Sequence, residues 1–414
     1  MKLLSVIIIS LLALFQTAVA QQGSVYTRYG LGDVQSTYSA RRLGMGELGT
    51  SVADEDFIGT LNPAGWNMLK MTRIEFGVAY NGLFVNDNIQ KKYYASTQVT
   101  GFTMAFPVSS TYGIGVALGI IPVTDVNYQV TTHNTDPNPI VGDYDLSYIG
   151  SGGLSKVFIG SSYRLPFDLS IGAEFDYYFG NINYSSSAVF TGSNNITSGF
   201  NKKYRPKAIG ITLGLISPDL LKASSSFFSD LHIGVSANLI FNSTIDSLLT
   251  SSSSVRVDTI NYYSYGMKIP NRINAGASVI LNKRFLVSLD YSYQPWSEFT
   301  INNMKPGFMR NLSMMSAGFE YRPVKELGGS FFDFVIFRGG LSYEQTQYFI
   351  NNTGINQYSA YGGCSFPISL QNTIDVGVQY YIRGQVTNDL IKENGIKVAF
   401  GISFGDIWFL RDTR

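Results

Sequence analysis

The feature that most constrains this chain is a two-residue alternation that recurs from about Thr72 to Phe409. Between Ile396 and Phe404, every second side chain is apolar, and most of the residues between them are small or polar. The same pattern runs through residues 73–80, 169–179, 285–293 and 372–383. A period of two places successive side chains on opposite faces of a strand. The chain is therefore expected to be all-β, with strands that are apolar on one face.

About fourteen strand-like segments can be delimited in this region. They are expected near residues 72–81, 93–107, 111–122, 145–165, 169–184, 204–217, 229–241, 271–281, 284–298, 307–322, 331–346, 357–367, 371–385 and 393–409. Segment 145–165 is long, and its Gly150-Ser-Gly-Gly153 stretch leaves open a division into two strands. Single-chain bacterial barrels have even strand numbers, so such a division would require a second change in the count.

The connections tend to alternate between short and long, except that those at 218–228 and 323–330, on the short side, are longer. Those at 108–110, 166–168, 282–283 and 368–370 are short, and those expected at 123–144, 185–203 and 242–270 are long and polar. Short turns at one end and long loops at the other are typical of a transmembrane β-barrel of the outer membrane. An even strand number would place both termini on the periplasmic side.

Composition supports a membrane barrel over a soluble protein. Only 14% of residues are charged, against about 25% in a typical soluble domain. No uncharged apolar run after the N-terminal leader reaches helix-spanning length, since the best covers 113–123. A soluble β-sandwich would also alternate, but it would leave the charge deficit unexplained. The net charge of +1 provides no basic field to recruit nucleic acid.

The N-terminal 71 residues differ from the rest. Residues 1–20 have the form of a secretory signal peptide, with Lys2, an apolar stretch and a small-residue site ending at Ala20. Residues 21–71 are Gly-rich and not strand-like, and we interpret them as a plug inside a barrel formed by 72–414. A G-x-G-x-x-G pattern begins at Gly44, but without a surrounding βαβ unit it indicates tight turns rather than a dinucleotide site.

Several motifs resemble those of the FadL family of outer-membrane transport barrels, in its Bacteroidetes-type branch. They are Arg28-Tyr-Gly-Leu-Gly-Asp33, Arg42-Leu-Gly-Met-Gly46, Asn62-Pro-Ala64, Gly152-Gly-Leu154, Asp290-Tyr-Ser-Tyr-Gln-Pro-Trp-Ser297 and Gly401-Ile-Ser-Phe-Gly-Asp-Ile-Trp-Phe409. The resemblance implies a fourteen-stranded barrel closed by an N-terminal hatch that carries Asn62, Pro63 and Ala64. It also implies passage of hydrophobic compounds and a lateral opening in the wall. No ligand-contacting residue can be named; Asn62-Pro63 could also simply start a helix or turn.

Two functions remain open. One is passive uptake of hydrophobic small molecules, such as long-chain fatty acids or aromatic hydrocarbons, with outer-membrane lipid and the ligand as partners. The alternative is an accessory barrel subunit of an outer-membrane protein secretion or assembly machine, with other envelope proteins as partners. An enzyme is not expected, because the chain has only two histidines, His133 in a loop and His232 on a lumenal face. No metal or cofactor is expected.

The charged residues at inward positions have two interpretations. They are Glu75, Glu174, Asp176, Asp290, Glu320, Arg322, Asp375, Arg383 and Lys397. A mixed-sign lining could hold the plug, with Arg41 and Arg42 pairing with lumenal carboxylates. Alternatively, Arg383 or Lys397 could receive a ligand carboxylate. Trp296 and Trp408, near strand ends, are expected in aromatic girdles at the membrane interface.

Overall fold

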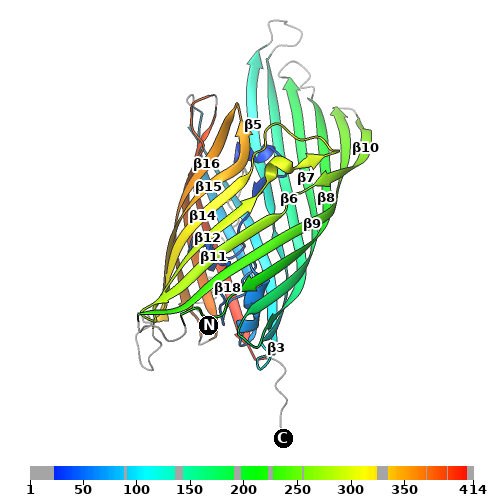
Figure 1. Ribbon diagram of the computed structural model, residues 1–414. Coiled ribbons are helices and arrows are strands. Elements are labelled where there is room, and N and C mark those ends of the chain that lie inside the picture. The colour runs from blue at the N-terminus through cyan, green and yellow to red at the C-terminus, as the bar shows by residue number, and fades with distance from the viewer. Residues whose placement is uncertain are drawn as a thin grey trace.

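The computed structural model is a closed antiparallel β-barrel (Figure 1). It describes residues 23–87, 91–135, 143–190, 197–221, 227–253, 256–323, 334–369, 371–388 and 390–407. The first strand of the wall, β2 (Thr72–Asn86), pairs with the last, β18 (Lys392–Asp406), and this pairing closes the sheet. Closure leaves no open edge along that seam, as a wall in contact with lipid requires. The expected signal peptide and Trp408 lie outside the described residues.

The wall has fourteen strand positions, as the sequence predicted. Its strands are β2, β3 (Lys91–Ser109), β4 (Ile114–Pro122), β5 (Thr124–Thr135), β6 (Asp143–Arg164), β7 (Ser170–Phe190), β8 (Thr197–Ile216), β9 (Phe228–Ser253), β10 (Val257–Lys268), β11 (Arg272–Leu281), β12 (Phe285–Gln294), β14 (Leu312–Tyr321), β15 (Ile336–Ile350), β16 (Thr353–Pro367), β17 (Thr373–Arg383) and β18. Two positions are interrupted, because β4 and β5 both pair with β6, and β10 and β11 both pair with β9. Segment 145–165 is one strand, β6.

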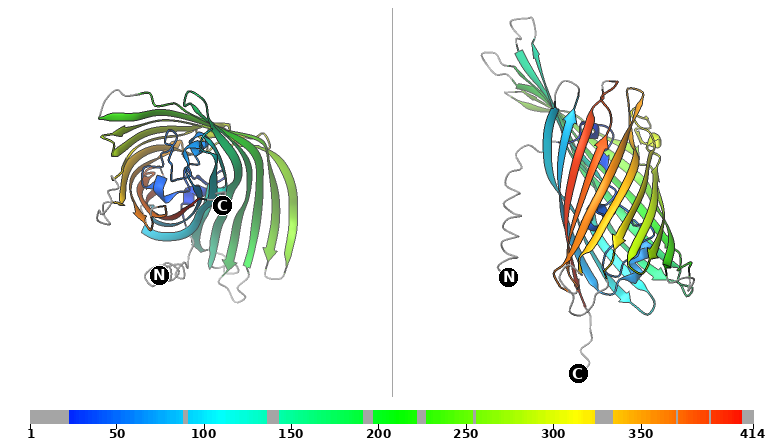
Figure 2. Two further views of the ribbon diagram at one scale, coloured as in Figure 1. Left: turned by 90° about the horizontal axis from the view of Figure 1, so that it is seen from below. Right: turned by 90° about the vertical axis from the view of Figure 1, so that its left-hand side faces the viewer.

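The prediction of long loops was partly wrong. Much of 123–144, 185–203 and 242–270 is strand, which extends the wall beyond the rest of the barrel on one side (Figure 2). In this extension both faces carry many serine, threonine, asparagine and tyrosine side chains, so the apolar alternation that marks a lipid-facing strand is absent. Cross-strand hydrogen bonding continues without it, since β6 and β7 remain paired from Arg164–Ser170 up to Tyr144–Phe190.

The two faces of the wall differ as a membrane barrel requires. Side chains such as Phe76, Phe175 and Leu289 are exposed on the outer face, at 44%, 50% and 58%. On the inner face of the same strands, Glu75, Glu174 and Ser288 are buried. None of the helices among the described residues is long and apolar enough to span a membrane.

The N-terminal segment, residues 23–71, lies inside the barrel (Figure 2, left). Its elements are short: η2 (Val25–Arg28), β1 (Asp33–Val34), α2 (Ala40–Leu43) and η3 (Pro63–Met68). Its apolar side chains are buried against the wall, and the most fully enclosed include Leu43, Met45, Leu48, Ile58 and Trp66. The stacking of Trp66 on Phe158 of β6, with ring centroids 6.1 Å apart, is one such contact.

The girdle prediction for Trp296 was wrong. Trp296 is 2% exposed and packs beside Phe299 in the largest apolar cluster of the interior, where their ring centroids are 5.5 Å apart. It begins η4 (Trp296–Glu298), directly after Pro295, which follows the last residue of β12, Gln294. Proline has no amide hydrogen to continue the ladder, so the chain turns inward here and takes the indole away from the outer face.

Candidate functional site

The lumen is the candidate site, and its most distinctive feature is a belt of inward-facing glycines. At these positions the main chain of the N-terminal segment lies where a Cβ atom would be. A Cβ at Gly377 of β17 would lie 2.3 Å from the Ala40 carbonyl oxygen, and one at Gly318 of β14 would lie 2.1 Å from the Met45 carbonyl oxygen. Only glycine allows backbone to approach backbone this closely.

The belt continues around the wall. A Cβ at Gly234 of β9 would lie 2.1 Å from the Thr50 carbonyl oxygen. One at Gly172 of β7 would lie 2.5 Å from the Ala64 nitrogen, and one at Gly115 of β4 would lie 2.3 Å from the Trp66 carbonyl oxygen. Between Ala40 and Trp66, the segment therefore follows the wall from β17 through β14, β9 and β7 to β4.

Several of these glycines face another glycine across the ladder. The pairs are Gly77–Gly101, Gly172–Gly214, Gly234–Gly276, Gly318–Gly340 and Gly363–Gly377. Each pair removes two neighbouring side chains from the inner face and so makes a flat place for the passing chain. This role of the glycines was not predicted from the sequence. The sequence feature that could have indicated it is a single glycine at an inward-facing position in most of the predicted strands.

The G-x-G-x-x-G pattern belongs to the same contact. Gly44 packs on Gly363, since a Cβ on Gly363 would lie 2.8 Å from the Gly44 Cα atom. Gly46 has a φ of 90°, which side-chain-bearing residues rarely adopt. The turn interpretation of these glycines therefore agrees with the backbone geometry.

Asn62, Pro63 and Ala64 lie where the segment crosses β7, β8 and β9. Asn62 is 2% exposed, and its side-chain oxygen accepts from the Ala64 amide at 3.0 Å, capping η3. Its side-chain nitrogen donates to the carbonyl oxygens of Thr50, Leu215 and Val235, at 2.6, 3.1 and 3.3 Å. Pro63 occupies the first position of η3, where its missing amide hydrogen is harmless. The motif thus joins two parts of the segment to the wall; its role in a hatch stays a prediction.

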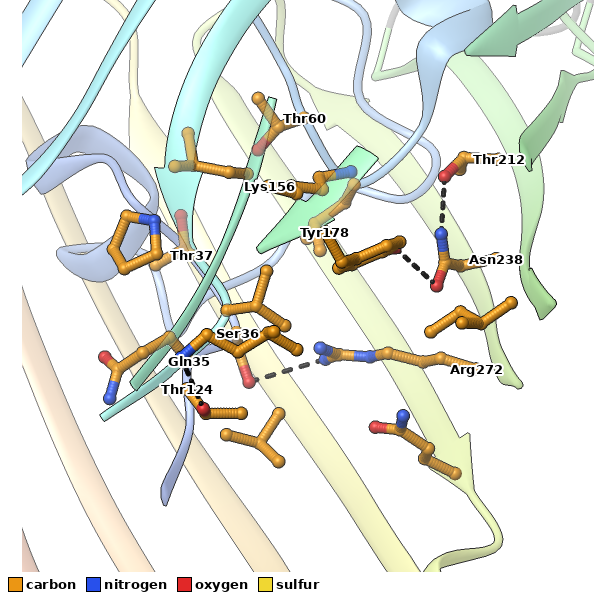
Figure 3. A pocket seen from close by; sticks show the side chains of 18 of the residues that line it. Gln35, Ser36, Thr37, Thr60, Thr124, Lys156, Tyr178, Thr212, Asn238 and Arg272 are labelled. Atoms are coloured by element: carbon orange, nitrogen blue, oxygen red, sulfur yellow. Dashed lines mark hydrogen bonds between the residues drawn. The ribbon is translucent and has the colours of Figure 1, made fainter. Parts of the chain in front are cut away.

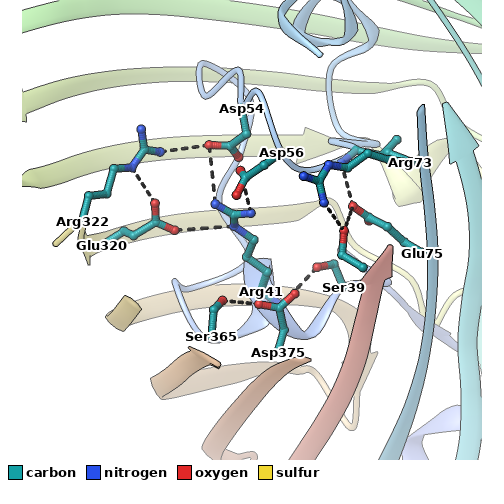
Figure 4. Close-up of polar contacts among 12 residues, drawn as sticks. Ser39, Arg41, Asp54, Asp56, Arg73, Glu75, Glu320, Arg322, Ser365 and Asp375 are labelled. Carbon is teal, nitrogen blue, oxygen red and sulfur yellow. Dashed lines mark hydrogen bonds and ion pairs between the residues drawn. The ribbon is translucent and has the colours of Figure 1, made fainter. Parts of the chain in front are cut away.

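A buried cluster of ion pairs connects the segment to β14, β15 and β17 (Figure 4). Arg41 reaches Asp56 at 3.0 Å and Glu320 at 3.7 Å. Arg322 and Arg338 both contact Glu320 at 2.6 Å, and Arg322 also reaches Asp54 of the segment at 2.9 Å. Glu320 and the Arg338 side chain are fully buried, so breaking these pairs would leave an uncompensated charge in the interior.

Burial and charge act in opposite directions on Asp56 of the segment. Burial alone would raise the pKa of its carboxyl, but Arg41 and Arg73 outweigh this and lower the pKa below its ordinary value. Asp56 therefore stays ionised near neutral pH and keeps its bond to Arg41. Arg42, the other predicted partner, pairs within its own segment, with Asp54 at 2.5 Å.

The two cations considered for a ligand carboxylate are both engaged with the segment. Arg383 of β17 pairs with Asp33 at 2.6 Å, and Lys397 of β18 donates to the Gln35 side-chain oxygen at 3.1 Å. Of the inward carboxylates, Asp290 accepts from the amides of Gly49 and Thr50, at 2.9 and 2.8 Å. These contacts follow the interpretation in which the charged lining holds the segment.

Two small cavities remain in the middle of the lumen. One, of about 90 Å³, lies between the segment at 34–38 and the wall, with Lys156, Tyr178, Asn238 and Arg272 among its lining residues (Figure 3). Its polar groups largely satisfy one another: the Tyr178 hydroxyl donates to Asn238 at 3.0 Å, and Lys156 pairs with Asp176 at 2.9 Å and with Glu174.

The second cavity, of about 100 Å³, is strongly polar and includes Glu47, Asp125, Glu344 and Lys397 in its lining. Burial raises the pKa of Glu47, although Lys397 opposes the shift. The cavity also reaches Gln98 of β3, beside a break in the ladder. Between Lys91 and Gly101, β3 pairs only with β2. On the other side of the break, β5 turns inward and pairs with the segment at Asp33 and Val34.

A third cavity, of about 680 Å³, lies at the short-turn end of the barrel. Its lining combines the ion-pair residues Arg41, Asp54 and Glu320 with turn residues such as Asp168 and Asp219. His232 also lines it, and its ring nitrogen is bound to the Ser217 carbonyl oxygen at 2.9 Å. Within the described ranges, no group of three or more histidine, cysteine or acidic residues could hold a metal ion.

The overall fold is shared with solved structures of two toluene transporters and a FadL homologue. The Pseudomonas putida toluene transporter TodX is 14% identical, with a TM-score of 0.57 over 92% of this chain and 99% of that one. The Ralstonia pickettii toluene transporter TbuX is 15% identical, with a TM-score of 0.54 over 89% and 98%. A Pseudomonas aeruginosa FadL homologue is 13% identical, with a TM-score of 0.57 over 90% and 98%. At such identities the likeness establishes a FadL-like barrel fold.

The sequence itself matches one family model and no curated protein. No curated protein matches this chain at a significant level. One family model, described as BamG, matches residues 1–413, which is nearly the whole sequence. The chain therefore belongs to the BamG family and has a FadL-like barrel fold.

Proposed function

We propose that this protein is an outer-membrane barrel whose lumen is permanently filled by its N-terminal segment, and that it serves as an accessory subunit of an outer-membrane protein secretion or assembly machine. In this proposal residues 1–20 are a removed signal peptide, residues 21–71 a fixed plug, and residues 72–414 the barrel. The last strand ends at the short-turn end, which we place on the periplasmic side, but the predicted periplasmic position of the N-terminal end is wrong: Ser24 and Tyr26 lie at the long-loop end, bonded to Glu393 and Ile391. The observation that carries it is the close backbone contact along the glycine belt.

The energetics of this contact favour a fixed plug over a moving hatch. Displacing residues 40–66 would uncover glycine-lined wall and separate Arg41 from Glu320 and Asp54 from Arg322. Buried ion pairs that lose one partner cost roughly 3–5 kcal/mol each. A shift of about 4 kcal/mol in a two-state equilibrium already corresponds to a population near one in a thousand. Routine opening would therefore need a compensating ligand or partner.

The size of the mid-lumen cavities also supports a closed barrel. At about 90 and 100 Å³, both are smaller than the roughly 150 Å³ cavity that admits benzene in an engineered protein core. The second cavity has a polar lining, and an apolar solute that entered it would leave the lining carboxylates without hydrogen-bond partners. Two mid-lumen cavities of this size suit a structural subunit, and the larger cavity of about 680 Å³ lies only at the short-turn end.

A second candidate is passive uptake of hydrophobic small molecules, such as long-chain fatty acids or aromatic hydrocarbons. Two observations favour it: the fold is shared with proteins described as toluene transporters, and the ladder is broken between β3 and β5. Such passage would require the segment at 33–38 to move, because its residues Val34, Gln35 and Ser36 line both mid-lumen cavities.

The test is native purification of the protein from its own membrane in mild detergent, followed by mass spectrometry of proteins and lipids. The accessory-subunit proposal predicts a stoichiometric complex with other envelope proteins and a lumen without extracted fatty acid or hydrocarbon. A lone barrel that carries a bound apolar molecule would reject it and favour transport.

A further inference from the structure

One row of side chains on the outer face of β8 changes abruptly from apolar to cationic. Leu215, Leu213, Ile211 and Ile209 are 41%, 47%, 39% and 36% exposed on this face. The next three outward positions, in the direction of the long-strand end, are Lys207, Arg205 and Lys203. Pro206 and Ala208, on either side of Lys207, point inward and are buried.

The neighbouring strands change at the same level. In register with Ile209 are Tyr177 of β7 and Phe241 of β9, both outward and apolar. One step further along each strand, Lys207 lies opposite Phe179 and Thr244, and Asn181 follows on β7. The rings of Tyr177 and Phe179 stack with centroids 6.2 Å apart, as expected of an aromatic girdle. This level therefore marks the edge of the lipid-facing band.

The three cations have little internal compensation. Among the described residues, neither Lys203 nor Arg205 has an ion-pair partner, and Lys207 is 3.5 Å from Asp246. Asp246 also lies opposite Arg205 in the ladder and accepts from Ser264 at 2.8 Å. With this carboxylate counted, the patch keeps two unbalanced positive charges. Alternate residues on a strand are about 6.7 Å apart, so the row spans roughly 13 Å.

We propose that Lys203, Arg205 and Lys207 bind the phosphate groups of lipids in the leaflet at the long-strand end. The inference rests on the membrane placement given above but not on the accessory-subunit role. A lipid fits this surface as a whole, because its acyl chains can lie on Ile209, Ile211 and Leu213 while its phosphate meets the cations. Arginine supplies a planar, bidentate donor for phosphate, and the flanking lysines add point charges.

The contact would fix the barrel's depth and rotation in the membrane beside the projecting strands. It lies on one side of the molecule, where β6–β9 extend beyond the band (Figure 1). Each basic residue near an anionic lipid surface adds to the attraction for that surface. Three of them on one strand face give a preference for phosphate-bearing lipid at this site.

The experiment uses the full chain in mild detergent, with lipid binding measured by native mass spectrometry. The probes are lipid A with both phosphates, the same lipid with both phosphates removed, and inorganic phosphate. The test variant is K203Q/R205Q. Its matched control is R256Q/K268Q, which removes the same two charges at the same end, from cations already paired with Asp258 at 2.5 Å and Glu298 at 2.6 Å.

We expect the wild-type protein and R256Q/K268Q to bind phosphorylated lipid A equally, and K203Q/R205Q to bind it at least tenfold more weakly. The phosphate-free lipid should bind all three alike, which also shows that the test variant remains folded. Unchanged binding by K203Q/R205Q would overturn the proposal, as would an equal loss in the control. Inorganic phosphate binding as tightly as the lipid would show an ion site instead of a lipid site.

Discussion

The glycine belt makes a quantitative prediction for Gly377→Ala. The new Cβ would lie 2.3 Å from the Ala40 carbonyl oxygen, about 0.7 Å inside the 3.0 Å below which such contacts essentially never occur. It would also meet the Gly44 nitrogen at 3.1 Å. The contacting atoms are main chain on both sides, so neither can rotate away. Overpacking of this kind typically costs 1–3 kcal/mol, and we expect a loss of about 2 kcal/mol in the free energy of unfolding.

Gly362→Ala is the matched control. Gly362 lies on the neighbouring strand β16, and a Cβ there would meet nothing within 4 Å. Both substitutions stiffen the unfolded chain by a similar amount, which alone would stabilise by about 0.4–1 kcal/mol. The difference between the two variants therefore isolates the contact with the segment. Urea unfolding of the barrel in lipid vesicles, followed by tryptophan fluorescence, measures it. If the two variants are equally stable, the belt does not hold the segment as described.

Three further substitutions test other parts of the account by the same unfolding assay. Asn62→Ala should destabilise by about 1–2 kcal/mol, because it removes a helix cap and three bonds to carbonyl oxygens; a loss under 0.5 kcal/mol would mean that the motif does not anchor the segment. Glu320→Gln should cost about 3–5 kcal/mol, because it leaves Arg338 and Arg41 buried without this carboxylate, and a near-neutral result would show that water solvates the cluster. Leu213→Arg, two outward positions inside the band edge at Ile209, should cost about 2–4 kcal/mol in a bilayer, whereas Asn201→Arg, on the same face of β8 beyond the cationic row, should cost under 1 kcal/mol; equal costs would place the membrane elsewhere.

The fold was largely predictable from the sequence, because two-residue alternation reports directly on a wall with one apolar face. Ile396 to Phe404 show this pattern, and all of these residues lie in β18. The extended strands could not be found in this way. Residues 242–253 of β9 carry no apolar row, since water contacts much of that region, although main-chain pairing with β8 and β10 continues there. Trp296 was misplaced because the sequence does not reveal that the chain turns inward after Pro295.

The candidate site was predictable in kind but not in detail. Alternation correctly placed Glu320 and Arg383 on the inner face, and opposite charges there suggested pairing with the segment. The partners themselves depend on how residues 23–71 fold inside the wall, and the sequence carries no periodic signal in that region. The glycines illustrate the difficulty most clearly. In the sequence, Gly318 and Gly377 do not differ from other strand glycines. Only the structure shows that the main chain of Met45 and Ala40 packs against them.

Hydrogen exchange of the intact protein, read by mass spectrometry, tests most directly whether the N-terminal segment is a fixed part of the barrel. Amides that are hydrogen-bonded and buried exchange only when the structure opens locally or globally. We expect the amides of Leu43, Gly44 and Ala64 to exchange as slowly as those of β14 to β17, since all three are hydrogen-bonded within the segment and enclosed by the wall. Exchange within seconds, at the rate of an exposed loop, would contradict it and restore a moving hatch.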